Sequence, residues 1–138
     1  MRKSAPPNCF SDAFADIETA LRLSPRDPGA PWRKFDICHL HTRLAQWEEA
    51  IDWCTKAAVA LPQVMMPLAF LASANAWAGH EKEAKEAAAK LEKVHPGFTI
   101  QSFASPSWSD DPTFKAQGLR IVEGLRKAGL PEGDKTTK

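Results

Sequence analysis

WEEAIDWCTKAAVALP (residues 47–62) recurs in outline as EKEAKEAAAKLEKVHP (residues 81–96), and every aligned position is displaced by 34 residues. Small or apolar residues and a closing proline keep their places in both copies. The matched pairs are Ala50 with Ala84, Cys54 with Ala88, Ala57 with Leu91, and Pro62 with Pro96. A fixed period of this length, closed each time by a helix-ending proline, predicts a repeated helical unit.

The residues before each copy align with the same offset. Ile37 matches Leu71, Cys38 matches Ala72, and Ala45 matches Gly79 in the turn. Each unit is therefore expected to be two antiparallel helices, with small residues where the helices cross so that larger neighbours can interlock. The two units span residues 28–62 and 65–96.

A half unit precedes them at residues 11–25, with Ser11 as the expected cap of its helix. No counterpart of a first helix comes before it, which predicts a fragment or a degenerate first unit. Its closing proline, Pro25, lies 37 residues before Pro62. The three extra residues are expected to lengthen either the RDPGAP link or the helix starting near Trp32.

The pattern changes after Pro96. Residues 97–110 are rich in serine and β-branched residues and are expected to be extended. A closing helix is predicted at residues 111–129, where Asp111 caps it, Pro112 opens it and Gly129 follows its end. One apolar stripe runs along this helix: Phe114, Ile121, Val122 and Leu125. A helix with one apolar face can cap a helical stack.

The 34-residue pattern resembles the tetratricopeptide repeat (TPR), which implies an all-α, TPR-like α-α superhelix. In this chain it would comprise about two and a half repeats and a C-terminal capping helix within a single domain, residues 1–138. The sequence departs from the family where aromatic residues are customary, at Lys34 and Leu68, and Leu91 is bulkier than usual.

The ending LRIVEGLRKAGLPEG, with the upstream DPTF and LSPRDP, resembles a narrower group. These are the TPR regions that follow the catalytic domain in class III adenylate/guanylate cyclases of alpha-proteobacteria. The resemblance implies a regulatory region of a cyclic-nucleotide signalling protein, without cyclase activity in this chain.

Composition gives no support to several classes of function. A net charge of +1 over 138 residues gives no field that would favour nucleic acid. Residues 57–80 carry no formal charge, but Pro62 and Pro67 interrupt them, so no membrane insertion is expected. Three cysteines without a CxxC pair (Cys9, Cys38 and Cys54) favour a reducing, cytoplasmic location.

No cluster of residues in the sequence predicts a metal site or a catalytic site. Cys38 with His39 and His41 lacks the i, i+4 spacing of paired helix ligands, so core packing is preferred and neither metal nor cofactor is expected. Asp110 and Asp111 are interpreted as a helix start. Without a nucleophile motif or phosphate-binding loop, the chain is not expected to be an enzyme. In residues 81–93, i, i+4 pairs such as Glu81–Lys85 and Glu86–Lys90 favour a solvated helix face.

In TPR proteins the first helix of each unit lines a concave groove, and the resemblance implies such a groove here. The predicted groove consists of Trp32, Phe35, His39, Arg43, Met66, Ala69, Ser73 and Trp77. Aromatic residues, Met and Arg are enriched where proteins bind one another. Alternatively, residues 97–109 or the final helix fold over this groove and make it ordinary core.

We therefore expect a non-catalytic module for protein–protein interaction or regulation, which binds a protein or peptide or forms homo-oligomers. The alternative is a small-ligand sensor, with a pocket between the groove and residues 97–110.

Overall fold

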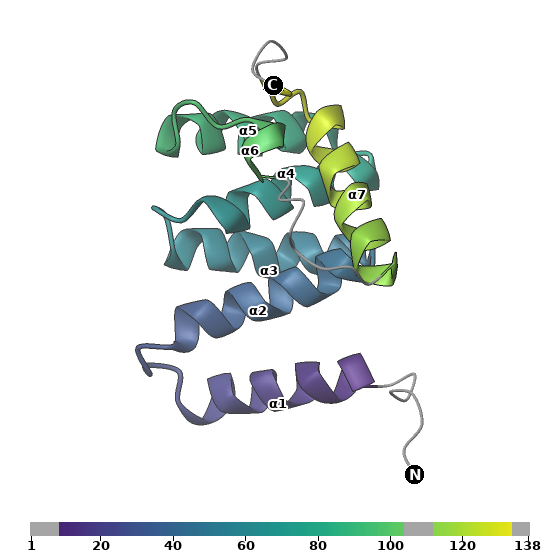
Figure 1. The fold of residues 1–138 in the computed structure, drawn as a ribbon. Helices are drawn as coiled ribbons and strands as arrows, with labels where there is room; N and C mark the ends of the chain where they lie inside the picture. Colours follow the sequence, from purple (N-terminus) through teal and green to yellow (C-terminus); the bar gives the residue numbers. More distant parts are fainter. Residues whose placement is uncertain (1–8, 104–111, 134–138) are drawn as a thin grey trace.

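The structure, a computed structural model, describes residues 9–103 and 112–133. Over these residues it is all-helical, with no strand. Helices α1 to α5 lie in sequence order through the molecule, and the long helix α7 runs steeply across them (Figure 1). The elements are α1 (Cys9–Leu23), α2 (Ala30–Arg43), α3 (Trp47–Ala60), α4 (Met65–Ala78), α5 (Glu81–Val94), α6 (Ile100–Phe103) and α7 (Pro112–Lys127).

Two helical hairpins carry the 34-residue period. α3 and α5 are each 14 residues long, and α5 begins and ends 34 residues after α3. Within each hairpin the helices pack closely. Ala45 and Gly79 both have positive φ, 59° and 88°, at the matching turns. The matched small residues are buried where the helices cross: Cys38, Ala50, Cys54 and Ala57 in the first hairpin, and Ala72, Ala84 and Ala88 in the second.

Helix α4 is the centre of the molecule. It contacts α3, α5 and α7, and less extensively α2. Residues on all its sides are therefore buried, including Leu68, Phe70, Ala72 and Ala74. This explains why α4 carries no charged residue, because a helix with neighbours on most sides has little solvent-facing surface for charges. No helix of the described residues is long and apolar enough to cross a membrane.

The first half unit differs slightly from expectation. Helix α1 begins at Cys9, so Ser11 lies inside the helix and the prediction that Ser11 precedes it was wrong. Helix α2 has the same 14-residue length as α4. Two of the three extra residues therefore lie in the link 24–29, which is longer than the corresponding link 61–64, and the third lies in the turn 44–46, which is longer than the turn 79–80. There Arg33 forms an ion pair with Asp27.

The described part of the segment expected to be extended, residues 97–103, contains the short helix α6 instead. Phe98, Ile100 and Phe103 are buried in the core. The backbone N–H groups of Ile100 and Gln101 donate to the carbonyl oxygens of Pro131 and Glu132, at 2.8 Å and 2.9 Å. Burial of three apolar side chains and anchoring by the chain end outweigh the local preference for extended structure.

The rest of that expected segment, residues 104–110, and the predicted cap Asp111 lie outside the described residues. Helix α7 begins at Pro112, as predicted. It ends at Lys127, two residues before the predicted end, and Gly129 follows with a φ of 93° and an N–H that donates to the Arg126 carbonyl oxygen at 3.0 Å.

Candidate functional site

The eight residues of the predicted groove lie on two neighbouring helices. Trp32, Phe35, His39 and Arg43 belong to α2, and Met66, Ala69, Ser73 and Trp77 belong to α4. The two helices contact each other, so the structure brings both sets to one region. The residues on α4 are partly covered by α7, whereas the α2 residue Trp32 is exposed.

Helix α7 covers the C-terminal half of α4. The hydroxyl of Ser73, which is 0% exposed, donates to the Ile121 carbonyl oxygen at 2.9 Å. The indole N–H of Trp77 donates to the Arg120 carbonyl oxygen at 2.8 Å, and the Lys127 ammonium lies 5.0 Å from the Trp77 ring centre. Both groove residues are therefore used for packing against the final helix.

A glycine makes this close approach possible. A Cβ atom at Gly124 would lie 2.1 Å from Ser73 Oγ and 2.9 Å from the Ser73 carbonyl oxygen, so no larger residue fits without movement of the helices. Sequence reasoning missed Gly124. Its position inside an otherwise regular helix was the available signal, because glycine there costs about 1 kcal/mol relative to alanine and needs a compensating reason.

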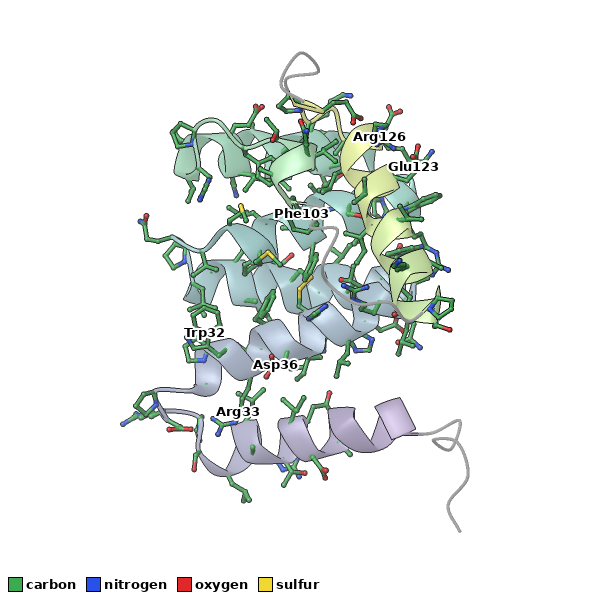
Figure 2. All side chains as sticks on the ribbon, viewed as in Figure 1. Trp32, Arg33, Asp36, Phe103, Glu123 and Arg126 are labelled. Carbon is green, nitrogen blue, oxygen red and sulfur yellow. A yellow bond between two sulfur atoms is a disulfide. The ribbon has the colours of Figure 1, made fainter. Side chains whose placement is uncertain are left out.

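The α2 half of the predicted groove ends in a row of aromatic rings. Phe103 of α6 meets Phe70 edge-on at 6.1 Å, and Phe70 stacks on Phe35 at 5.7 Å. Trp32 then meets Phe35 edge-on at 6.3 Å. Exposure rises along this row: Phe103 and Phe70 are buried, Phe35 is half-buried, and Trp32 is 49% exposed. Figure 2 shows Phe103 well inside the molecule and Trp32 near its edge, at the start of α2.

His39 and Arg43 form a pair next to this row. The His39 ring stacks on Phe35 at 5.8 Å and on Phe70 at 5.0 Å, and Arg43 Nε donates to His39 Nε2 at 3.1 Å. Burial, with a contribution from the Arg43 charge, lowers the pKa of His39 to about 4. Burial also lowers the pKa of Arg43. His39 is thus neutral at pH 7 and accepts the hydrogen bond from Arg43.

Asp36 adds a negative charge beside Trp32. It is exposed on α2, one turn after Trp32. Partial burial raises the pKa of its carboxyl, and the charge of Arg33 opposes that change. Figure 2 shows Asp36 and Trp32 along the same helix. We call Trp32, Phe35 and Asp36 the Trp32 surface.

Cys38 and Cys54 form a disulfide between α2 and α3, with their Cα atoms 4.8 Å apart. Sequence reasoning gave both residues only a packing role and took them as signs of a reducing compartment; it missed the bond. The signal was present, because both residues occupy crossing positions of the same hairpin, where side chains of the two helices meet. The Thr42 hydroxyl lies beside the bond, 3.8 Å from Cys54 Sγ.

The other polar side chains of the described residues form no candidate metal site. Within residues 9–103 and 112–133, no group of three His, Cys, Asp or Glu side chains could hold a metal ion. Cys38, which the sequence analysis considered as a metal ligand and rejected, is bonded to Cys54. His41, from the same set, has its Nδ1 atom 2.7 Å from Gln46 Oε1. The i, i+4 pairs expected on α5 are not ion pairs in the described part of the chain, although the charged residues of that helix are exposed.

No protein-family model matches this chain, and no curated protein matches it.

Proposed function

We propose that this chain is a non-catalytic protein-interaction module that binds an apolar, basic peptide segment on the Trp32 surface. The observation that carries the proposal is the aromatic row that ends there. Four rings connect the core to solvent, and the last one, Trp32, is 49% exposed at the start of α2. Tryptophan is one of the residue types most enriched among binding hot spots.

The Trp32 surface also has a charge preference. Asp36 lies one turn from Trp32, and among the described residues the structure gives it no ion pair. A lysine or arginine of a bound peptide would pair with this exposed carboxylate and could stack on an aromatic ring as well. The Asp36 carboxylate would repel an acidic peptide end.

The wider context of this function is also a proposal. The paired helices with a 34-residue period support a TPR-like superhelix, and the ending of the chain supports a role in cyclic-nucleotide signalling, as a relative or part of a cyclase. Homo-oligomerisation through the Trp32 surface is an alternative use of the same residues. A cytoplasmic location stays a prediction, and the Cys38–Cys54 bond weighs against it because such bonds are rare in reducing compartments.

A peptide library displayed on phage tests the proposal. Peptides selected on the wild-type protein should be rich in apolar and basic residues, and Trp32→Ala should weaken their binding roughly 30-fold, the usual cost of losing a hot spot of about 2 kcal/mol. Asp36→Asn should weaken chiefly the peptides that carry Lys or Arg.

Leu119→Ala is the matched control, because Leu119 is 69% exposed on α7, a different helix from Trp32. It removes an exposed apolar side chain and should leave binding unchanged. Circular dichroism should show the same helicity for all three variants. Selected peptides that bind Trp32→Ala as tightly as the wild type would contradict the proposal.

A further inference from the structure

A second surface lies on the other side of α4 from α7. Leu71 is two residues from Ser73, and two residues turn a helix by roughly 200°, so Leu71 points away from the side that α7 covers. Leu71 and Leu68 form the floor of a groove between α3 and α5. Its volume is about 300 Å³, and its walls include Val59, Pro62, Lys90 and Lys93. We call this hollow the α3–α5 groove.

The same kind of hollow occurs one unit earlier in the chain. The α1–α3 groove has a volume of about 430 Å³, and Leu21, Arg22, Pro25, Lys34, Trp53 and Lys56 line it together with Glu18. Lys56 lies 34 residues before Lys90, and Pro25 corresponds to Pro62 as the proline that closes its unit. The two grooves are therefore equivalent parts of successive units, each between the second helices of neighbouring pairs.

Positive charge lines both grooves. Lys90 and Lys93 are the charged residues that line the α3–α5 groove, and the structure gives neither of them an ion pair within the described residues. In the α1–α3 groove three cations outnumber one carboxylate. Lys56 there has an exposed partner, Asp52, at 3.2 Å, but a pair of this kind contributes little and competes weakly with a ligand.

Apolar surface lies between these charges. Val59 is 76% exposed on the wall of the α3–α5 groove, and Leu71 on its floor is half-buried. In the other groove Trp53 is half-buried, and the Lys56 ammonium lies 4.3 Å from its ring centre. A ligand that matches both features has carboxylates for the lysines and apolar side chains for the hollows between them.

We propose that the two grooves bind one linear peptide segment of a partner protein, rich in Asp or Glu and in large apolar residues. Two equivalent hollows in successive units favour a linear chain over a small molecule, which would occupy only one. Because packed helices lie about 8–10 Å apart, the grooves are separated by on the order of 20 Å, a distance that about ten peptide residues bridge easily. This surface is separate from the Trp32 surface and does not depend on it.

Fluorescence anisotropy with a labelled peptide of alternating Glu and Leu, about ten residues long to reach both grooves, tests the proposal. The Lys90→Gln/Lys93→Gln variant should bind this peptide about tenfold more weakly, as expected for the loss of two charge pairs, and added salt should weaken wild-type binding. A Glu/Ser peptide should bind more weakly than Glu/Leu, and a Lys/Leu peptide should not bind.

The matched control is Lys82→Gln/Lys85→Gln. It makes the same change of charge on the same helix, at exposed lysines that do not line the groove. Equal losses in the two double variants, or no binding of the Glu/Leu peptide to the wild type, would overturn the proposal. So would lysine-dependent binding to phosphatidylglycerol vesicles without peptide binding. Trp32→Ala should leave this peptide's affinity unchanged, so failure here is distinguishable from failure of the Trp32 surface.

Discussion

Replacing Gly124 with alanine tests how α7 packs on α4. The added methyl group would lie 2.1 Å from Ser73 Oγ and 2.9 Å from both Ser73 Cβ and the Ser73 carbonyl oxygen. Oγ can rotate, but the backbone oxygen can move only with α4. Helix α7 must therefore shift, and the hydrogen bond from Ser73 to the Ile121 carbonyl oxygen is strained or lost.

The magnitude follows from three contributions. Overpacking of a well-packed contact costs about 1–3 kcal/mol, and the buried hydrogen bond contributes about 1 kcal/mol. Alanine is a better helix former than glycine by about 1 kcal/mol, which opposes the loss. Gly124→Ala should therefore lower the free energy of unfolding by about 1–3 kcal/mol, which corresponds to several degrees in Tm for a domain of this size.

Urea and thermal unfolding followed by circular dichroism measure the effect. Ser73→Gly in the same molecule removes two of the three close atoms and should recover part of the loss, with a coupling energy above about 0.5 kcal/mol. Leu119→Ala, on the exposed side of α7, is the control and should change stability little. If Gly124→Ala is as stable as the wild type or more stable, α7 does not pack on Ser73 as described.

Two further predictions concern buried groups of α2. His39 has a folded pKa of about 4, below its ordinary 6.5, so the unfolded chain binds the proton first. The contribution of neutral His39 to the free energy of unfolding should be full above pH 6.5 and fall by on the order of 3 kcal/mol as the pH drops towards 4. The difference in free energy of unfolding between wild type and His39→Gln, measured across this pH range, tests this. A difference that does not change with pH would contradict it. Reducing the Cys38–Cys54 bond, which joins residues 16 positions apart, should lower the free energy of unfolding by about 3 kcal/mol. Urea unfolding with and without reductant measures this difference, and Cys54→Ala, which cannot form the bond, should show none. If the urea midpoint of the wild type is the same with and without reductant, the bond does not contribute to stability.

Much of the helical architecture could be predicted from the sequence because the 34-residue period is local information. Each hairpin repeats small residues at its crossing points, and a proline closes it, so helix positions follow from Ala50 and Ala84 outward. The end of α7 was equally local, because a glycine with positive φ is the ordinary end of a helix. The positions of the helices and the end of α7 are therefore set by residues that are close together in the sequence.

The contacts of the last third of the chain are not local, and here prediction from sequence stopped. Phe103 belongs to a segment whose composition favours extended structure, and its helical form depends on burial in the core beside Phe70 and on backbone hydrogen bonds to the end of the chain. The apolar stripe of α7 shows that the helix has a buried side, but it does not say which surface it covers. Two signals in the sequence pointed to such contacts. Gly124 indicated a close approach of α7 to another helix, and the crossing positions of Cys38 and Cys54 indicated a bond between α2 and α3.

Helix α7 covers the Trp77 end of the predicted groove and leaves the Trp32 end exposed. Hydroxyl-radical footprinting of the wild-type protein, read at each tryptophan by mass spectrometry, tests this most directly. Trp32 should be oxidised several-fold faster than Trp77 in the folded protein, and the two rates should become equal in denaturant. Equal rates in the folded protein, or faster oxidation of Trp77, would show that α7 does not cover the Trp77 end.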